Sequence, residues 1–397
     1  MSAFRVILRN ALDEARFLAG PGRATLLVLL GVPIVYPLIM AWLYSANVAV
    51  QRPVLVVDDD RSALSRQLQL DLDATQEVAV TGRPADVAEG LAAVRRGEAE
   101  MLLWIPPDYS QRIKHHETAR LPVWVDSANL LTYAAGMPGL SGVVQAHNET
   151  LGRRFFLERG MTTALAEARV MPVVREDRVL YRPGFGYGDF LISGVYAVVV
   201  QQIVLIGLMV SFGLAAERGL RRGHGRHALA DLAGRALAHL PFYLSGSAIL
   251  VFGMYPLAGW TVVNGRALFG LFALLTLVAM PMSATFARLA KDRFDAFLLL
   301  MFLSTPSFMA SGYAWPTDQM PAWVQAAAAT LPLTPALKAL RTVATATGDL
   351  SSVLPELAHI GVLGLCWSGV LVASVGIGRW IDARRGIPPA PVSKPGS

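Results

Sequence analysis

The sequence predicts a polytopic α-helical membrane protein with six transmembrane helices and an inserted α/β domain that is extracytoplasmic. Hydrophobic residues make up 54% of the chain and charged residues only 16%, whereas a soluble globular chain carries about 25% charged residues. Six apolar runs reach or approach the length of a membrane span. Between the first two runs lies a long segment of ordinary soluble composition.

Each of the six runs lacks Asp, Glu, Lys and Arg. A bilayer core about 30 Å thick needs roughly 20 apolar helical residues to cross it. The fifth run is the shortest, and Asp295 stands at its edge. The predicted spans are residues 24–45, 190–214, 236–260, 267–287, 296–312 and 357–378.

The positions of Lys and Arg orient these spans, because cytoplasmic loops carry an excess of both residues. If the N-terminus is cytoplasmic, the opposite side holds only Arg266, Lys338 and Arg341 outside the inserted domain. Both termini are therefore predicted to be cytoplasmic. The net charge of +6 is read as a topology signal, so nucleic acid is not expected as a partner. The basic residues then on the cytoplasmic side are Arg5, Arg9, Arg16, Arg23, Arg218, Arg221, Arg222, Arg226, Arg235, Arg288, Lys291, Arg293, Arg379, Arg384, Arg385 and Lys394.

Residues 1–23 are predicted to form a cytoplasmic helix at the membrane interface, followed by the first transmembrane helix at 24–45. Apolar residues recur there at helical spacing, and arginines on other faces can approach anionic headgroups. A solvated helix leading into the span fits the same pattern. A cleaved signal peptide is disfavoured because the apolar run is too long. The apolar positions are Phe4, Leu8, Ala11 or Leu12, Ala15 and Leu18.

Residues 46–188 are predicted to be an extracytoplasmic α/β domain, because candidate strands alternate with candidate helices. The helices are expected from Ser62, over 84–96 and near 139–160, and an extended piece over 170–180 leads back to the membrane. The strands are expected at 53–57, 77–80, 99–105 and 121–125.

No motif in the chain indicates catalysis or a metal site. Three adjacent carboxylates, at 58–60, point to alternate faces of an extended chain and make a poor cation cage. His147 is interpreted as a core histidine and Cys366 as a small buried hydrophobe. A phosphate-binding loop of the Gly-x-x-x-x-Gly-Lys-Ser/Thr type is absent, so ATP-driven work would need a separate ATPase subunit.

Residues 189–380 are predicted to be a five-helix transmembrane region with an external hairpin at 312–350, and residues 381–397 a cytoplasmic tail. Polar groups inside spans are costly and tend to face protein or water. Packing between helices explains these polar residues as well as a transport path does. His239 and His359 are expected near the ends of their spans, where they can contact water. The transport-path candidates are Gln201, Gln202, His239, Asn264 and His359.

Several segments in order resemble the permease subunit of type-2 ABC exporters, in the branch with a large extracytoplasmic domain after the first span. The resemblance covers nearly the whole chain. After Gly219 the sequence departs from the family, which often has a Thr-Pro-like end there. The similar segments are 56–66 (VVDDDRSALSR), 92–99 (AAVRRGEA), 104–109 (WIPPDY), 123–129 (VWVDSAN), 311–316 (SGYAWP), 320–323 (MPAW) and 331–336 (LPLTPA).

This resemblance implies two permease subunits, identical or related, above two ATPase subunits that hold ATP and Mg, with no cofactor and no metal in this chain. It implies that the protein lies in a bacterial inner membrane and contacts membrane lipid. It also implies that a periplasmic adaptor and an outer-membrane channel could continue the transport path. The expected cargo is amphipathic, drug-like or lipid-like, and moves outward. A gradient-driven transporter and a membrane sensor with an extracytoplasmic ligand-binding domain are the alternatives, weakened by the absence of intramembrane carboxylates and of a cytoplasmic effector domain.

The resemblance also suggests two groups of functional residues. ATPase-coupling candidates lie in the N-terminal helix and after the second span, and external-gate candidates lie in the hairpin. Fixing the topology and anchoring aromatic rings are the simpler roles for the same residues. The coupling candidates are Arg5, Arg9, Arg16, Glu217, Arg218, Gly219, Arg221 and Arg222, and the gate candidates are Gly312, Tyr313, Trp315, Pro316, Pro321, Trp323, Pro332 and Pro335.

Overall fold

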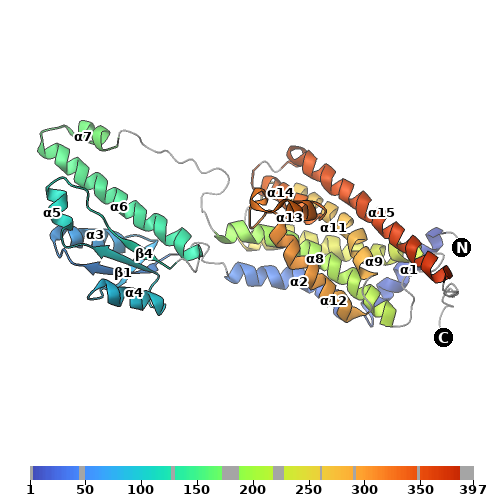
Figure 1. The fold of residues 1–397 in the computed structure, drawn as a ribbon. Helices are drawn as coiled ribbons and strands as arrows, with labels where there is room; N and C mark the ends of the chain where they lie inside the picture. The colour runs from blue at the N-terminus through green and yellow to red at the C-terminus, as the bar shows by residue number, and fades with distance from the viewer. Residues whose placement is uncertain are drawn as a thin grey trace. The chain divides into compact units, whose positions relative to one another are not determined.

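The protein is described by a computed structural model in which the chain divides into two compact units (Figure 1). Unit 1 comprises residues 1–45 and 180–397, and unit 2 comprises residues 46–179. Each unit is described by itself. The residues that the structure describes are 3–43, 50–126, 130–171, 187–217, 228–259, 262–288, 292–346 and 349–384.

Unit 2 contains a four-stranded sheet in the order β2-β1-β3-β4. The central strand β1 pairs in parallel with both β2 and β3, and β3 pairs antiparallel with β4. All four strands coincide with predicted ones to within two residues at each end. Their bounds are β1 Arg52–Asp58, β2 Val78–Gly82, β3 Met101–Ile105 and β4 Val123–Val125.

Helices cover both faces of this sheet. One face packs against α3, α5 and α6 through a core that includes Leu68, Tyr109 and Leu140, and the other packs against α4 through Ala93. Ser62 caps α3, as predicted. The helices are α3 Ala63–Asp73, α4 Val87–Arg95, α5 Tyr109–Lys114, α6 Leu130–Glu158 and α7 Thr163–Val170.

Three features of unit 2 differ from the expectation. Helix α6 begins nine residues before the predicted start, and the short helices α5 and α7 were not predicted. Position 170 is the last residue of α7 rather than part of an extended piece. Residues 172–180 of that piece lie outside the described residues.

The described residues of unit 1 form helices that turns and short loops connect. It begins with α1 Ala3–Ala19 and α2 Arg23–Leu43, and continues after unit 2 with α8 Tyr187–Glu217. The remaining elements are α9 Ala228–Ala248, π-helical η1 Ile249–Met254, α10 Tyr255–Leu257, α11 Gly265–Ala287, α12 Arg293–Ala310, η2 Thr317–Gln319, α13 Ala322–Ala329, α14 Leu333–Arg341, η3 Thr342–Ala346, η4 Leu350–Val353 and α15 Leu354–Arg384.

Among the residues that the structure describes, five helical stretches are long and apolar enough to cross a membrane. Each corresponds to a predicted span, although the third begins eight residues and the last seven residues earlier than expected. The remaining predicted span, 296–312, corresponds to α12, whose apolar part Phe297–Ala310 is shorter. The five stretches are Arg23–Leu43, Leu191–Leu214, Ala228–Leu257, Gly265–Ala287 and Leu350–Ile381.

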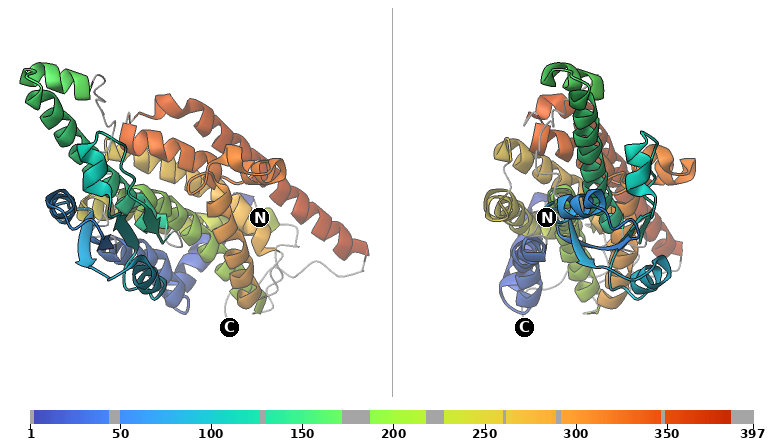
Figure 2. Two further views of the ribbon diagram at one scale, coloured as in Figure 1. Left: turned by 60° about the vertical axis from the view of Figure 1, so that its left-hand side comes forward. Right: turned by 90° about the vertical axis from the view of Figure 1, so that its left-hand side faces the viewer.

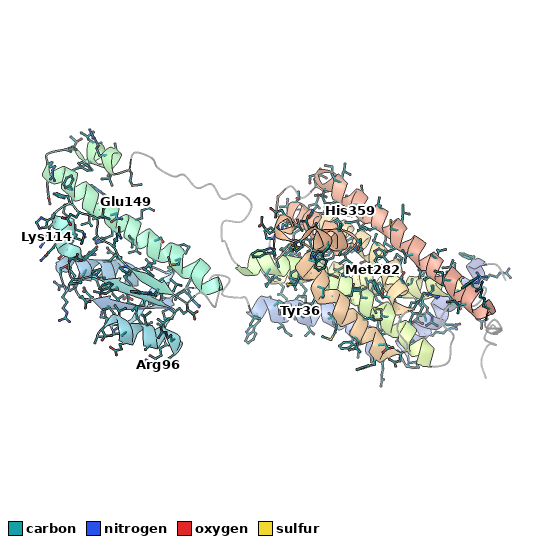
Figure 3. The ribbon with its side chains drawn as sticks, in the orientation of Figure 1. Tyr36, Arg96, Lys114, Glu149, Met282 and His359 are labelled. Atoms are coloured by element: carbon teal, nitrogen blue, oxygen red, sulfur yellow. The ribbon has the colours of Figure 1, made fainter. Side chains whose placement is uncertain are left out.

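Helices α8 and α11 form the centre of unit 1, where Met282 is fully buried (Figure 3). About 70% of the apolar part of these two helices is buried, against 17% for α2 and α15. Helix α15 runs along one side of the helical unit (Figure 2). Cys366, on α15, is exposed, so its predicted burial is wrong: the apolar run around it faces outward from unit 1.

Candidate functional site

A buried charged cluster joins three helices of unit 1. It centres on Glu14 of α1, whose side chain is 5% exposed. Ser211 of α8 donates its hydroxyl proton to Glu14 Oε1. Nε2 of His239 on α9 donates to the same oxygen at 3.1 Å, and Nη1 of Arg235 donates to Oε2 at 2.9 Å. The carboxylate is thereby satisfied by donors from two other helices.

A second polar contact lies one helical turn away on the same helix pair. Nδ2 of Asn10 donates to Oδ1 of Asp231 at 3.2 Å, and Asp231 pairs with Arg235 at 3.5 Å. Asn10 and Glu14 are four residues apart on α1, as are Asp231 and Arg235 on α9, so both pairs share one side of their helices. Polar side chains thus line the interface between α1 and α9.

Two glycines allow the helices to approach closely enough for these contacts. A Cβ atom at Gly234 of α9 would lie 2.7 Å from the carbonyl oxygen of Ile7 on α1. A Cβ atom at Gly207 of α8 would lie 2.3 Å from the hydroxyl of Tyr243, which contacts Nδ1 of His239 at 3.3 Å. A larger residue at Gly234 would push the two backbones apart, and one at Gly207 would displace the Tyr243 hydroxyl.

The cluster holds Glu14 in its charged form. Burial raises the pKa of Glu14, but the hydrogen bond from His239, the charge of Arg235 and the hydrogen bond from Ser211 together outweigh it. The pKa of this carboxyl group therefore lies below its usual value. A buried carboxylate that stays ionised makes charge-assisted hydrogen bonds, which are stronger than neutral ones.

The predicted coupling residues that the structure describes on α1 are not part of this cluster. Arg5 and Arg16 are exposed on α1, and both Arg9 and Arg16 pair with Asp13, at 3.7 and 3.5 Å. Glu217 is the last residue of α8, and its side chain lies outside the described residues, as do Arg218, Gly219, Arg221 and Arg222. The sequence reasoning missed Glu14, although its place on the apolar face, three residues after Ala11 and four before Leu18, was the available signal.

The transport-path candidates are not brought together. The expectation that His239 sits in a wet place is wrong, since its side chain is fully buried in the charged cluster. Gln201 is 1% exposed, and its Oε1 has no hydrogen-bond partner among the described residues, whereas the adjacent Gln202 is half-buried. His359 is exposed and donates to the carbonyl oxygen of Ala329, which ties α15 to α13 (Figure 3).

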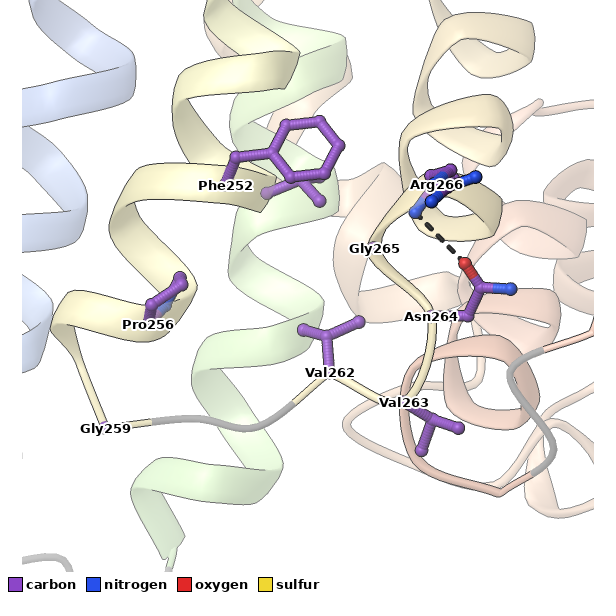
Figure 4. A pocket seen from close by; sticks show the side chains of 9 residues that line it. Phe252, Pro256, Gly259, Val262, Val263, Asn264, Gly265 and Arg266 are labelled. Carbon is purple, nitrogen blue, oxygen red and sulfur yellow. Dashed lines mark hydrogen bonds between the residues drawn. The ribbon is translucent and has the colours of Figure 1, made fainter.

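Asn264, the remaining path candidate, lies at a cavity of about 760 Å³ between η1, α10 and the start of α11 (Figure 4). Its Oδ1 accepts from the backbone N–H groups of Arg266 and Ala267, so it caps α11. Apolar side chains form most of the wall, and Arg266 lines it as well. The lining residues are Val251, Phe252, Pro256, Gly259, Val262, Val263, Asn264, Gly265 and Arg266.

The predicted gate residues lie in a hairpin of short helices. Pro321 and Pro332 precede α13 and α14, Pro316 precedes η2, and Pro335 is buried inside α14. Trp315 and Trp323 are 60% and 75% exposed. Neither short helix could cross a bilayer alone, which agrees with the interrupted pattern of this segment.

Tyr313 is a gate candidate whose side chain is fixed by contacts with two other residues. Its side chain is 4% exposed, and its hydroxyl lies 2.7 Å from that of Ser193 on α8. The guanidinium of Arg341 lies 4.6 Å from the centre of the Tyr313 ring and donates to the Tyr313 carbonyl oxygen at 2.7 Å. Gly312 precedes it with φ +84°, a conformation that favours glycine.

The three adjacent carboxylates of unit 2, at 58–60, have structural partners. Asp58 accepts from Ser65 and Gln69, Asp59 from the indole N–H of Trp104, and Asp60 from Ser110. Within the described residues no group of three or more potential ligands could hold a metal ion. His147 is buried and contacts Asp71 at 3.4 Å, in agreement with its interpretation as a core histidine.

These features define a multi-pass membrane protein, whose described part contains five long apolar helical stretches and a network of buried charges between helices. A sequence model of the family described as ABC-2 family transporter protein matches residues 23–373. The chain therefore belongs to this family and is the permease component of an ABC transporter. Comparison with curated proteins finds no match.

Proposed function

We propose that this chain is an exporter permease that dimerises and couples ATP hydrolysis on a separate ATPase subunit to outward movement of an amphipathic substrate. The family match over 23–373 carries this proposal. ATP and Mg would bind to the ATPase subunit, because the sequence has no phosphate-binding loop. The second permease subunit is either a copy of this chain or a related one.

The proposed topology has six spans, with α12 as the fifth. Its 18 residues would cover about 27 Å as a helix, slightly less than the hydrocarbon core. Both termini would be cytoplasmic in a bacterial inner membrane, since basic residues concentrate on that side. Unit 2 would then be extracytoplasmic, where an adaptor and an outer-membrane channel could continue the path.

The cavity beside Asn264 supports an amphipathic cargo. Its walls are largely apolar, and Asn264 and Arg266 are the polar residues that line it. Apolar surface binds a hydrocarbon portion, while a fixed amide and a guanidinium orient a polar end. Since Ala228–Leu257 and Gly265–Ala287 are both candidate spans, the cavity at their connection would lie near the level of the lipid headgroups.

Affinity purification from the native membrane in mild detergent tests this function. We expect a stoichiometric partner with phosphate-loop motifs and vanadate-sensitive ATPase activity. If no such subunit is recovered in several detergents and after crosslinking, the exporter proposal fails. Flux that follows an ion gradient without ATP would then favour the gradient-driven transporter, and ligand-triggered signalling without flux would favour the sensor.

A further inference from the structure

The charged cluster around Glu14 lies where α1 meets the end of α8 and the start of α9. Both α1 and these helix ends could transmit movement from an ATPase. Helix α9 starts at Ala228, immediately after the 218–227 segment, and Asp231 and Arg235 occupy its first two turns. Ser211 and Phe212 lie in the last two turns of α8, which ends just before the same segment. Glu14 contacts both sides of this corner.

Helix α1 is in turn closely connected to α2. The backbone N–H of Gly22 donates to the carbonyl oxygen of Phe17 at 2.7 Å, and that of Arg23 donates to Gly20 at 3.1 Å. A Cβ atom at Gly22 would lie 2.6 Å from the Phe17 ring. This tight turn leaves little freedom between the two helices, so a displacement of α1 is passed directly to the first candidate span.

The way α1 is packed is unusual for a helix at a membrane surface. Its polar residues Asn10 and Glu14 face the protein, while Phe4, Leu8 and Leu12 are 48–71% exposed. Ala11 and Leu18 of the same helix are buried, so directional polar contacts add to apolar ones in holding α1 in unit 1. A buried ion pair of this kind fixes a register but is costly to break on one side only.

We infer that Glu14, Arg235 and His239 are positioning residues for energy coupling, which make α1 and the α8–α9 corner move as one body. This inference rests on the proposed function. Movement of the corner when the ATPase closes is then carried through the Glu14 cluster to α1, and through the Gly20–Gly22 turn to α2. The arginines on the exposed face of α1 are not needed for this link.

The test uses the complete complex in vesicles of phosphatidylethanolamine and phosphatidylglycerol. Coupling is measured as the ATPase rate of the complex relative to that of the isolated ATPase subunit. Movement is measured by electron–electron resonance between spin labels at Leu8→Cys and Leu365→Cys in a Cys366→Ser background. Both labelled positions are exposed, and wild type is expected to change this distance on trapping with ATP and vanadate.

Glu14→Gln should retain the ATPase subunit but lose the distance change, with stimulation reduced at least tenfold. Asp13→Asn is the matched control, because it removes a neighbouring exposed carboxylate from the same helix, and it should behave as wild type. Glu14→Gln leaves Asp231 as the charged partner of Arg235. If this variant does not fold, the double variant Glu14→Gln/Arg235→Gln decides, since it removes both charges of the buried pair, while Asp231 keeps the hydrogen bond from Asn10.

The double variant is expected to fold, to bind the ATPase and to remain uncoupled. The inference would be overturned if either variant showed the same ATPase stimulation and the same distance change as the wild-type complex. It would also be overturned if the wild-type complex stimulated the ATPase while the distance to the α1 label stayed constant. Recovery of no ATPase with the wild-type chain would instead reject the proposed function, so the two failures are distinguishable.

Discussion

The hydroxyl groups of Tyr313 and Ser193 lie 2.7 Å apart, which ties the segment after α12 to the beginning of α8. We predict that Tyr313→Phe and Ser193→Ala each destabilise unit 1, and that their effects are not additive. The ring–guanidinium contact with Arg341 survives in Tyr313→Phe, so only the hydroxyl contact is lost. A double-mutant cycle in detergent should give a coupling of about 0.6 kcal/mol, as interhelical hydrogen bonds in membrane proteins do. Strict additivity would contradict the contact.

Gly194 should not tolerate a side chain, because a Cβ atom there would lie 2.3 Å from Cε1 of the buried Tyr313 ring. We expect Gly194→Ala to destabilise the protein by about 1–3 kcal/mol, the usual cost of overpacking. Gly361→Ala on α15 is the matched control, since nothing lies within 4 Å of its Cβ position. That variant should be neutral or slightly stabilising. Thermal unfolding of the three proteins in detergent, detected by their aggregation, measures the difference in stability.

Asn264 has a structural role that must be separated from any contact with cargo. As the N-cap of α11, it should lose about 1 kcal/mol of stability when changed to Ala and almost none when changed to Asp. If the amide also binds substrate, Asn264→Asp will fold normally yet transport poorly. Normal transport by Asn264→Asp would leave only the capping role.

The sequence located the long apolar helices and all four strands because each depends on local hydrophobic pattern. It did not reveal the Glu14 cluster, whose members are up to 225 residues apart and whose contacts depend on how α1, α8 and α9 pack. His239 illustrates this: its position along the span suggested water, but Gly207 leaves room for it inside the bundle. Asn264 carried a recognisable N-cap pattern before α11, which was read only as a polar group in a span.

Tyr109 should give unit 2 a characteristic response to alkaline pH. Burial raises the pKa of its phenol to about 12 from an ordinary value of 10.0, with the charges of Asp60 and Asp71 adding to the shift. Because the raised pKa favours the neutral folded form, this contribution is complete below pH 10 and is lost as the pH rises towards about 12. The stability of wild type relative to Tyr109→Phe should fall by up to about 1.4 kcal/mol per pH unit in this window. If the absorbance difference between the two proteins shows that the phenol titrates at pH 10, this prediction is wrong.

Cys366 offers a simple test of the span formed by α15. It is exposed on the surface of unit 1 and lies close to the middle of the Leu350–Ile381 stretch. In intact vesicles we expect little labelling by a membrane-soluble maleimide and none by a charged, membrane-impermeant one from either side, because maleimides react with the thiolate form, which water favours. Denaturation in detergent should make the thiol reactive to both. Reaction with the charged reagent before denaturation would place this face of α15 in water.

The separation of 221 residues between Glu14 and Arg235 also has a consequence for biosynthesis. At roughly 5–20 residues per second, the ribosome needs roughly 10–45 s after making Glu14 before Arg235 exists. During that interval α2 can enter the membrane while α1 still lacks the partners for its carboxylate. Insertion of the first span therefore precedes the packing of α1 against its partners. The N-terminal helix packs onto α8 and α9 only after Arg235 and His239 have been synthesised.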